Sequence, residues 1–348
     1  MLSKDAKLLE VSDLSLAFKS NNEFLEILSQ INFELKPGKT LGLVGESGCG
    51  KTLTSYSLMR LLPLSAHYAE NAKILFQDQD LLSLEAHQMR QLRGRKIAMV
   101  FQEPMLSLNP VRTFYMQLND VIAAHQHLTD EQRHQRIISL MQDVEIDSPE
   151  EKLQQYPHQW SGGQKQRFLI AMAIANMPEI LIADEPTTAL DIFVQEQILN
   201  LLKKLQAKYG LSILMISHNL KVIESMADEV MIMYLGEVIE TSDAKSFWQQ
   251  PLHPYVHQLI DALPNFSKRL FKLPSIPGKV PSFEELPSGC RFHPRCQFAM
   301  PICQAKAPEW YQATTSHGVR CHLYPRESPI NLMSTSKTLK LPPKNISG

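Results

Sequence analysis

Short runs of apolar residues alternate with longer stretches of helical periodicity along most of the chain. Five such runs cover residues 40–45, 96–101, 179–185, 211–217 and 229–234. Apolar runs of this length are typical of strands that are buried on both faces of a parallel sheet. Residues 1–39 differ, because the segments VSDLSLAF and INFEL alternate apolar and polar positions. This alternation predicts half-exposed antiparallel strands, so the pattern indicates an α/β fold with an added antiparallel part.

The same pattern indicates where the chain divides. About 75 residues between the second and third apolar runs are mainly helical in pattern and predict an inserted helical subdomain at about 103–172. Five prolines between residues 263 and 290 break regular structure and predict a boundary after a first domain at 1–262. A small cysteine-bearing extension follows at 263–325, and the polar tail at 326–348 is expected to be flexible.

Composition and charge narrow the class of protein. The chain has 348 residues, which is enough for one large domain with a smaller appendage or for two domains. Its 35 basic and 36 acidic residues give a net charge of -1, which argues against a surface dedicated to nucleic acid. The N-terminus lacks the apolar core of a signal peptide, and the apolar runs are far shorter than the roughly 20 residues that span a membrane. We therefore expect a cytosolic chain whose contact with a membrane depends on partners.

One glycine-rich segment carries the strongest chemical signal. Residues 45–52 read GESGCGKT and match the P-loop pattern G-x-x-x-x-G-K-[ST], directly after an apolar run and before a helical pattern. In such a loop, glycines let successive backbone N–H groups surround the phosphates of a nucleotide, and the helix N-terminus adds a positive end. Lys51 is expected to reach the β and γ phosphates, and the Thr52 hydroxyl is expected to bind Mg²⁺. The other predicted ATP-binding positions in the loop are Gly45, Ser47, Gly48, Cys49 and Gly50.

Two carboxylates follow the apolar run ILIA at residues 180–183. Ligand sites in open α/β sheets lie at the carboxyl ends of the strands. Asp184 is therefore predicted to hold Mg²⁺, and Glu185 to orient and deprotonate the attacking water. The pair could also act as a helix N-cap ahead of Pro186, a role that would not exclude chemistry.

A third segment, WSGGQ at residues 160–164, precedes an apolar helical stretch. Ser161 is expected to cap this helix, whose N-terminus would face an anion. Together with the P-loop and the carboxylates, SGGQ resembles the signature sequence of the ATP-binding cassette (ABC) family, over about residues 8–262. The resemblance implies a RecA-like sheet with an antiparallel β subdomain and a helical subdomain. It also implies that two subunits pack head to tail, so that ATP on the partner meets the signature residues Ser161, Gly162, Gly163 and Gln164.

The resemblance assigns further roles by motif. Gln102 in VFQEP resembles the Q-loop glutamine that senses Mg²⁺ and the attacking water. His218 in MISHN resembles the switch histidine that contacts the γ-phosphate, and Asp191 in TALD resembles the D-loop aspartate that communicates across the dimer. Phe18 in LSLAF is similar to the aromatic residue that stacks on adenine, although Phe24 could serve instead.

This chain departs from the family pattern at two positions. Trp160 stands where Leu usually precedes SGGQ, and Asn219 stands where Asp usually follows the switch histidine. Neither side chain is expected to touch phosphate. The resemblance therefore implies an active ATPase in which helix packing differs locally.

Two further segments resemble one branch of the family, the ATPase subunits of dipeptide and oligopeptide permeases. They are FQEPMLSLNP at residues 101–110 and a C-terminal stretch with HPY at 253–255 and LPSGCRFHPRC at 286–296. The resemblance implies ATP-driven import of di- or oligopeptides, in which residues after Gln102 receive two membrane permease subunits. It also implies a related but non-identical second ATPase subunit, an extracytoplasmic peptide-binding protein, and a peripheral position on the cytoplasmic face of the inner membrane.

Other functions stay open at this level. Glutathione and nickel complexes are imported by systems of the same type, in which other chains choose the cargo. A soluble cassette ATPase that acts on nucleic acid or ribosomes typically carries two fused cassettes or a long coiled-coil insertion, and the sequence shows neither. A soluble ATPase regulated by redox state would use the cysteines of the extension as its sensor.

Four of the five cysteines crowd near the C-terminus and are spaced C-x5-C-x6-C-x17-C: Cys290, Cys296, Cys303 and Cys321. In a reducing location such a group favours a metal over disulfides. Four thiolates suit Zn²⁺ or a [4Fe–4S] cluster, and the spacing lacks the paired C-x2-C knuckles of common zinc sites. The resemblance to the permease branch implies a [4Fe–4S] cluster with a structural role, with Zn²⁺ as the alternative. His293 and His322 are alternative ligands, and four thiols without a metal are the remaining interpretation.

Overall fold

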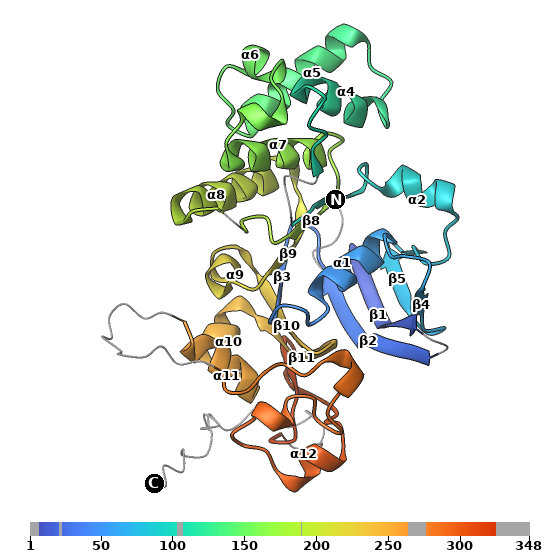
Figure 1. The fold of residues 1–348 in the computed structure, drawn as a ribbon, viewed down its shortest axis with the longest axis vertical. Helices are drawn as coiled ribbons and strands as arrows, with labels where there is room; N and C mark the ends of the chain where they lie inside the picture. Colours follow the sequence, from blue (N-terminus) through green and yellow to red (C-terminus); the bar gives the residue numbers. More distant parts are fainter. Residues whose placement is uncertain (1–6, 21–22, 103–106, 189, 264–275, 325–348) are drawn as a thin grey trace.

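A computed structural model describes residues 7–20, 23–102, 107–188, 190–263 and 276–324 of the chain (Figure 1). Residues 103–106 of the expected permease-contact segment, residues 264–275 of the proline-rich segment and the expected flexible tail at 326–348 lie outside the described residues. The strands are β1 (Leu9–Ser20), β2 (Glu23–Leu35), β3 (Thr40–Val44), β4 (Ala66–Tyr68), β5 (Lys73–Phe76), β6 (Gln79–Asp80), β7 (Ile97–Val100), β8 (Ile180–Asp184), β9 (Ser212–Ser217), β10 (Glu229–Tyr234), β11 (Glu237–Asp243), β12 (Trp310–Thr314) and β13 (His317–Arg320). The helices are α1 (Lys51–Met59), α2 (Ala86–Leu92), α4 (Phe114–Ala123), α5 (Asp130–Asp143), α6 (Pro149–Leu153), α7 (Gly162–Ile174), α8 (Ile192–Tyr209), α9 (Leu220–Met226), α10 (Ala244–Gln249), α11 (Pro254–Asp261) and α12 (Pro301–Ala305), with short 3₁₀ turns η1 (Pro157–Gln159), η2 (Phe283–Glu285) and η3 (His293–Arg295).

Five parallel strands, β10, β3, β9, β8 and β7, form one side of the main sheet, whose order is β12-β13-β11-β10-β3-β9-β8-β7. They are the five apolar runs of the sequence, so the predicted buried strands are confirmed. Alternate residues of β8 enter two different hydrophobic clusters, because successive side chains of a strand point to opposite faces. Leu181 packs with the cluster that contains the helical part, and Ile182 with the cluster that contains β1 and β2.

The N-terminal residues form a second, antiparallel sheet. β1 pairs with β2 from Leu9 opposite Leu35 to Ser20 opposite Glu23, and β5 and β4 pair with β1 on its other edge. The expected antiparallel strands are confirmed. This sheet lies beside α1, on the side of the main sheet opposite α7 and α9 (Figure 1).

Helices α4 to α7 fall between β7 and β8, where the pattern predicts an inserted helical part. They form one end of the molecule, and the C-terminal extension with α12 forms the other end (Figure 1). Among the residues that the structure describes, no helix combines the length and the apolar character needed to cross a membrane.

The C-terminal extension adds strands to the main sheet. β13 pairs antiparallel with β11, with Glu240 opposite Val319, and β12 pairs with β13. His317 lies beside Glu240, with 2.9 Å between its Nε2 and a carboxylate oxygen, and both side chains are buried. The same carboxylate accepts the backbone N–H groups of Leu252 and His253. A fully bonded buried carboxylate thus ties β11, the start of α11 and the hairpin together.

Candidate active site

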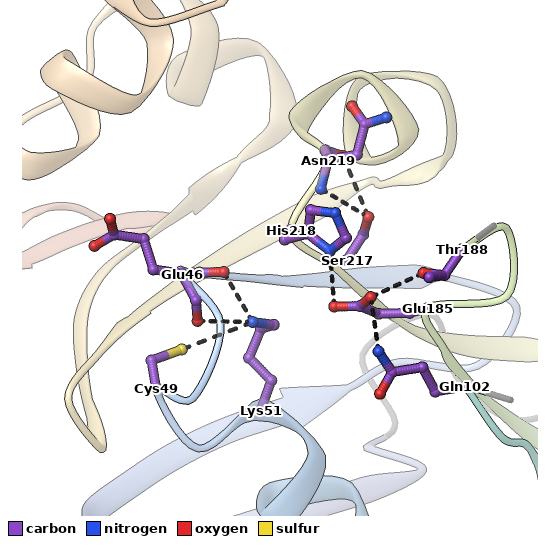
Figure 2. Close-up of polar contacts among 10 residues, drawn as sticks. Glu46, Cys49, Lys51, Gln102, Glu185, Thr188, Ser217, His218 and Asn219 are labelled. Atoms are coloured by element: carbon purple, nitrogen blue, oxygen red, sulfur yellow. Dashed lines mark hydrogen bonds and ion pairs between the residues drawn. The ribbon is translucent and has the colours of Figure 1, made fainter. Parts of the chain in front are cut away.

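The P-loop joins β3 to α1 at the carboxyl end of the parallel strands. Gly50 has φ 106°, a backbone conformation that only glycine adopts easily. A Cβ at Gly45 would lie 2.4 Å from the carbonyl oxygen of Met233, so glycine is required there as well. Lys51 is buried, and its ammonium group donates to the carbonyl oxygens of Gly45 at 2.8 Å and Glu46 at 3.0 Å (Figure 2). The loop itself therefore orients the lysine.

Cys49 packs inside the loop and is 1% exposed. Burial raises the pKa of its thiol above the usual value of 9.0, although the charge of Lys51 opposes the rise. A buried, protonated thiol reacts poorly. The side chain therefore fills space beside Lys51.

Asp184 ends β8 with a carboxylate that is 1% exposed and has no hydrogen-bond partner of good geometry for either oxygen. Burial raises its pKa to about 6, the Thr52 hydroxyl nearby opposes the rise, and the charge of Glu185 adds to it. A buried carboxylate without a partner is costly. A divalent cation at this carboxylate and the Thr52 hydroxyl would remove that cost, so these residues fit the predicted Mg²⁺ site.

Glu185 is held by three side chains (Figure 2). One carboxylate oxygen accepts from the Gln102 amide at 3.2 Å and the Thr188 hydroxyl at 2.8 Å, and the other lies 2.9 Å from His218 Nδ1. Burial favours the neutral carboxyl, but the bonds from His218 and Thr188, with the charge of Lys51, leave its pKa below the usual 4.5. Glu185 is therefore an ionised carboxylate at neutral pH, with fixed orientation.

The structure thus places two predicted residues, Gln102 and His218, in contact with the predicted Glu185, which faces Lys51 across the site (Figure 2). The sequence does not predict the contact of Thr188 with Glu185, because a single threonine in a turn after the carboxylates belongs to no recognisable motif. Its spacing of three residues from Glu185, within one turn, is the signal that could have found it. Backbone strain also marks the position, since Glu185 has φ 48° without being glycine.

The signature segment caps α7 as the sequence predicts. The Ser161 hydroxyl accepts the N–H of Gln164 at 3.3 Å, and the Gln164 side chain accepts the N–H of Ser161 at 3.1 Å, which forms a capping box. Ser161 and Gly162 are exposed. Asp191 caps α8 by accepting the N–H groups of Phe193 and Val194 at 3.0 Å each.

The two departures from the family pattern have structural explanations. Trp160 is buried, packs against Phe114 with the two rings tilted by 32° and their centroids 3.8 Å apart, and donates its indole N–H to Gln155 at 2.8 Å. Asn219 caps α9 by accepting the N–H of Lys221 at 3.0 Å, as an aspartate would. Trp160 therefore changes the packing next to α7, whereas Asn219 keeps the N-cap of α9.

Phe18 and Phe24 both lie on the strands of the antiparallel sheet. Phe18 is partly buried and packs against the cluster under that sheet, whereas Phe24 is exposed and contacts the His67 ring edge-on at 5.1 Å. The role of Phe18 in stacking on adenine stays a prediction.

The four cysteines of the extension line one small pocket, together with His293, His322 and apolar side chains. Burial raises the pKa of Cys290 to about 11 and of Cys321 to about 12, and nearby thiols add to both. The two histidines hydrogen-bond to backbone carbonyls, His293 to Cys290 at 3.0 Å and His322 to Lys306 at 2.7 Å. In the described part of the chain, no group of three or more His, Cys, Asp or Glu side chains is arranged to hold a metal ion. The donor set suits a metal in kind, but the expected cluster is not established by this arrangement.

Comparisons with known proteins agree with the site. Residues 28–188 match the family model described as ABC transporter, and residues 239–303 match the one described as oligopeptide/dipeptide transporter, C-terminal region. The oligopeptide transport ATP-binding protein AppD of Bacillus subtilis (strain 168) is 40% identical over 320 residues, which cover 92% of this chain and 98% of AppD. The dipeptide transport ATP-binding protein DppD of the same strain is 39% identical over 328 residues, which cover 94% of this chain and 98% of DppD.

A solved structure shows the same cassette fold. The ATP-binding cassette MJ0796, a dimer bound to ADP and Pi in a post-hydrolysis state, is 26% identical with a TM-score of 0.60 over 68% of this chain and 98% of that one. The P-loop, the paired carboxylates and the capped signature helix are thus found in a chain that its relatives match almost from end to end. The chain belongs to the ABC transporter family, in the branch whose ATP-binding subunits carry the oligopeptide/dipeptide transporter C-terminal region.

Proposed function

We propose that this chain binds and hydrolyses ATP to drive the import of dipeptides or oligopeptides through an ABC transporter. The observation that carries the ATPase activity is the ionised Glu185 carboxylate, held by three side chains across from the P-loop lysine. The peptide cargo is supported by the C-terminal region matched at 239–303 and by relatives named for oligopeptide and dipeptide transport.

Each residue of the site has a role in this proposal. Lys51 exchanges the carbonyl oxygens of its own loop for the β and γ phosphates of ATP, which the loop N–H groups also bind. Glu185 orients the attacking water and accepts its proton, and His218 contacts the γ-phosphate. Mg²⁺ would neutralise charge on the phosphates and would be held by Thr52, Gln102 and Asp184.

The proposed working unit is a heterodimer with a related ATPase subunit. Its support in this chain is the exposed signature segment, together with Ile192 and Phe193, which are each 80% exposed at the start of α8 next to Asp191. Large apolar side chains that lie exposed next to each other mark a candidate interaction surface. We divide the chain into a nucleotide-binding domain at 1–262, with its helical subdomain at about 103–172, and an extension at 263–325.

The proposed partners in the membrane are two permease subunits, fed by an extracytoplasmic peptide-binding protein, which place this chain peripherally on the cytoplasmic face. A pocket beside Gln102 supports a contact there, because it is mostly apolar and lined by Met59, Phe101, Val121, Leu169 and Met172 among others. Closure of the ATPase dimer would move this surface and change the access of the transport path.

Reconstituted transport tests the function. Proteoliposomes that contain this chain, its sister ATPase and both permeases, supplied with the binding protein, are expected to accumulate a labelled dipeptide or oligopeptide only with ATP. Glutathione and a nickel complex serve as competing cargoes. Uptake of either one without peptide uptake would contradict the peptide assignment and leave the ATPase intact.

We also propose that Cys290, Cys296, Cys303 and Cys321 hold a [4Fe–4S] cluster in the extension. The common pocket and the kind of donor support this. The cluster would tie together a segment that is rich in proline, and its role would be structural.

Anaerobic purification tests the cluster. About four irons with matching acid-labile sulfide are expected per chain. Cys321→Ser should lose most of this iron, whereas His322→Ala, a matched change at the neighbouring residue, should keep it. Stoichiometric zinc without iron would replace the cluster by the alternative metal.

A further inference from the structure

The extension reaches the P-loop through one arginine. Arg295 lies in η3, between Cys290 and Cys296, and is 6% exposed. Its guanidinium donates two hydrogen bonds to the Glu46 carboxylate, at 2.6 and 3.0 Å. It also donates to the Pro277 carbonyl at 3.0 Å and to the Tyr234 hydroxyl at 3.3 Å. A two-pronged charged contact of this kind fixes orientation as well as distance.

A second contact holds the backbone of the same P-loop residue. The N–H of Glu46 donates to the hydroxyl of Tyr255 at 3.2 Å, and Tyr255 belongs to α11. The Tyr255 ring is buried against Tyr234 and against Phe292 of the extension, with centroids 4.9 and 5.2 Å apart. Both the main chain and the side chain of Glu46 are therefore positioned from the C-terminal part of the molecule.

The direction in which Glu46 points has a consequence for ATP. Its carbonyl oxygen accepts from the Lys51 ammonium group, while its carboxylate points away from that group (Figure 2). ATP brings several negative charges into the loop. A carboxylate free to turn toward the phosphates would repel them and compete for Lys51, so its position and its neutralisation by Arg295 both favour ATP binding.

We propose that Arg295 is a positioning residue for ATP, which keeps the Glu46 carboxylate paired and turned away from the phosphate site. The C-terminal extension thereby sets the ATP affinity of the P-loop. This inference rests on the proposed ATP site at residues 45–52. It predicts an effect on binding rather than on the chemical step, because Arg295 contacts none of the side chains that hold Glu185.

The test is a cycle of variants in the full chain, with the dissociation constant of a fluorescent ATP analogue and steady-state ATPase kinetics as readouts. Arg295→Met keeps volume but removes the charge, and it is expected to weaken binding and raise KM about tenfold, with kcat within about twofold. Glu46→Gln should bind ATP at least as tightly as the unsubstituted chain. The double variant should regain most of the lost affinity, because no free carboxylate is left.

Two controls separate this role from general damage to the extension. Arg291→Met removes an arginine of the same segment, which donates to the Leu235 carbonyl and pairs with Glu237 at 3.2 Å, and it should leave ATP affinity unchanged. If Arg295→Met does not fold, Arg295→Lys replaces it in the test. Lysine keeps the charge but cannot make the bidentate contact, so this variant is expected to bind ATP about threefold more weakly, and adding Glu46→Gln should restore the affinity.

Three results would overturn the proposal: unchanged affinity in the Arg295 variants, an affinity that Glu46→Gln does not restore, or an equal loss in Arg291→Met. A failure of the proposed function looks different. In that case the unsubstituted chain would not bind the analogue, or the Lys51→Ala variant would bind it with the same affinity as the unsubstituted chain.

Discussion

Glu185→Gln is expected to lower the ATPase turnover by about 100- to 10,000-fold while ATP binding is kept. Glutamine preserves the shape of the side chain and can still contact Thr188 and His218, but it cannot accept a proton from water. Because ATP is then no longer hydrolysed, the ATP-bound state persists, and a closed dimer should accumulate with ATP and Mg²⁺. Phosphate release and size-exclusion chromatography measure the two effects.

Glu179→Gln is the matched control for this substitution. Glu179 precedes β8 at its other end, where it pairs with Lys96 at 2.5 Å on the surface. Losing that exposed pair should leave turnover within about twofold. Turnover in Glu185→Gln equal to that of Glu179→Gln would contradict the role of Glu185 as the base.

Asp184→Asn is expected to abolish most Mg²⁺-dependent hydrolysis, by about 100-fold or more, and at the same time to stabilise the nucleotide-free fold at neutral pH. The first effect follows from the loss of a carboxylate ligand for Mg²⁺. The second follows from the buried position of Asp184, whose oxygens have no hydrogen-bond partner of good geometry. Asparagine removes a buried charge, which is the costly part.

The pH dependence gives the sign of this stabilisation. Burial raises the pKa of Asp184 from 3.8 to about 6, so the folded state binds the proton more tightly than the unfolded state. The contribution of Asp184 to the free energy of unfolding is therefore fully present below about pH 4 and is lost as the pH rises through about 6. A rise of this size corresponds to about 3 kcal/mol of folding stability lost at neutral pH. Asparagine does not titrate, so the variant should gain most at pH 7.5 and little at pH 4.

Thermal unfolding without nucleotide or Mg²⁺ measures this difference, and Asp184→Asn should raise Tm by several degrees at pH 7.5. Glu185→Gln is the control with the opposite expectation, because the pKa of Glu185 is lowered and its charge is already stabilised by hydrogen bonds. A lower Tm for Asp184→Asn at pH 7.5 would show that the carboxylate is satisfied in the apo protein. Saturating Mg²⁺ and ATP should reverse the order of stability, since only aspartate gains the metal.

Much of the fold and the residues of the candidate nucleotide site could be predicted, because the deciding information is local. Five apolar runs fix the parallel strands, and Gly45, Lys51 and Thr52 stand at fixed offsets in one loop. Asp184 and Glu185 follow from the strand before them, because the carboxyl end of a buried strand is where its charges can emerge.

Contacts between distant segments could not be predicted in this way. Arg295 and Glu46 are 249 positions apart, and nothing in LPSGCRFHPRC indicates that its last arginine faces a P-loop. The pairing of β13 with β11 could not be predicted from the sequence either, because β12 and β13 are short and follow a segment rich in proline. The orphaned oxygens of Asp184 are also a property of packing rather than of pattern.

The β12–β13 hairpin determines how the rest of the chain can be handled. It covers the edge of β11, and its His317 faces the fully buried Glu240. A chain cut after residue 262 would leave the N–H and C=O groups of that edge exposed beside a carboxylate that has lost a partner. The unpaired backbone groups of an open edge strand can pair with strands of other molecules, so the shortened cassette should aggregate. We therefore expect the extension, through this hairpin, to keep the ATPase soluble.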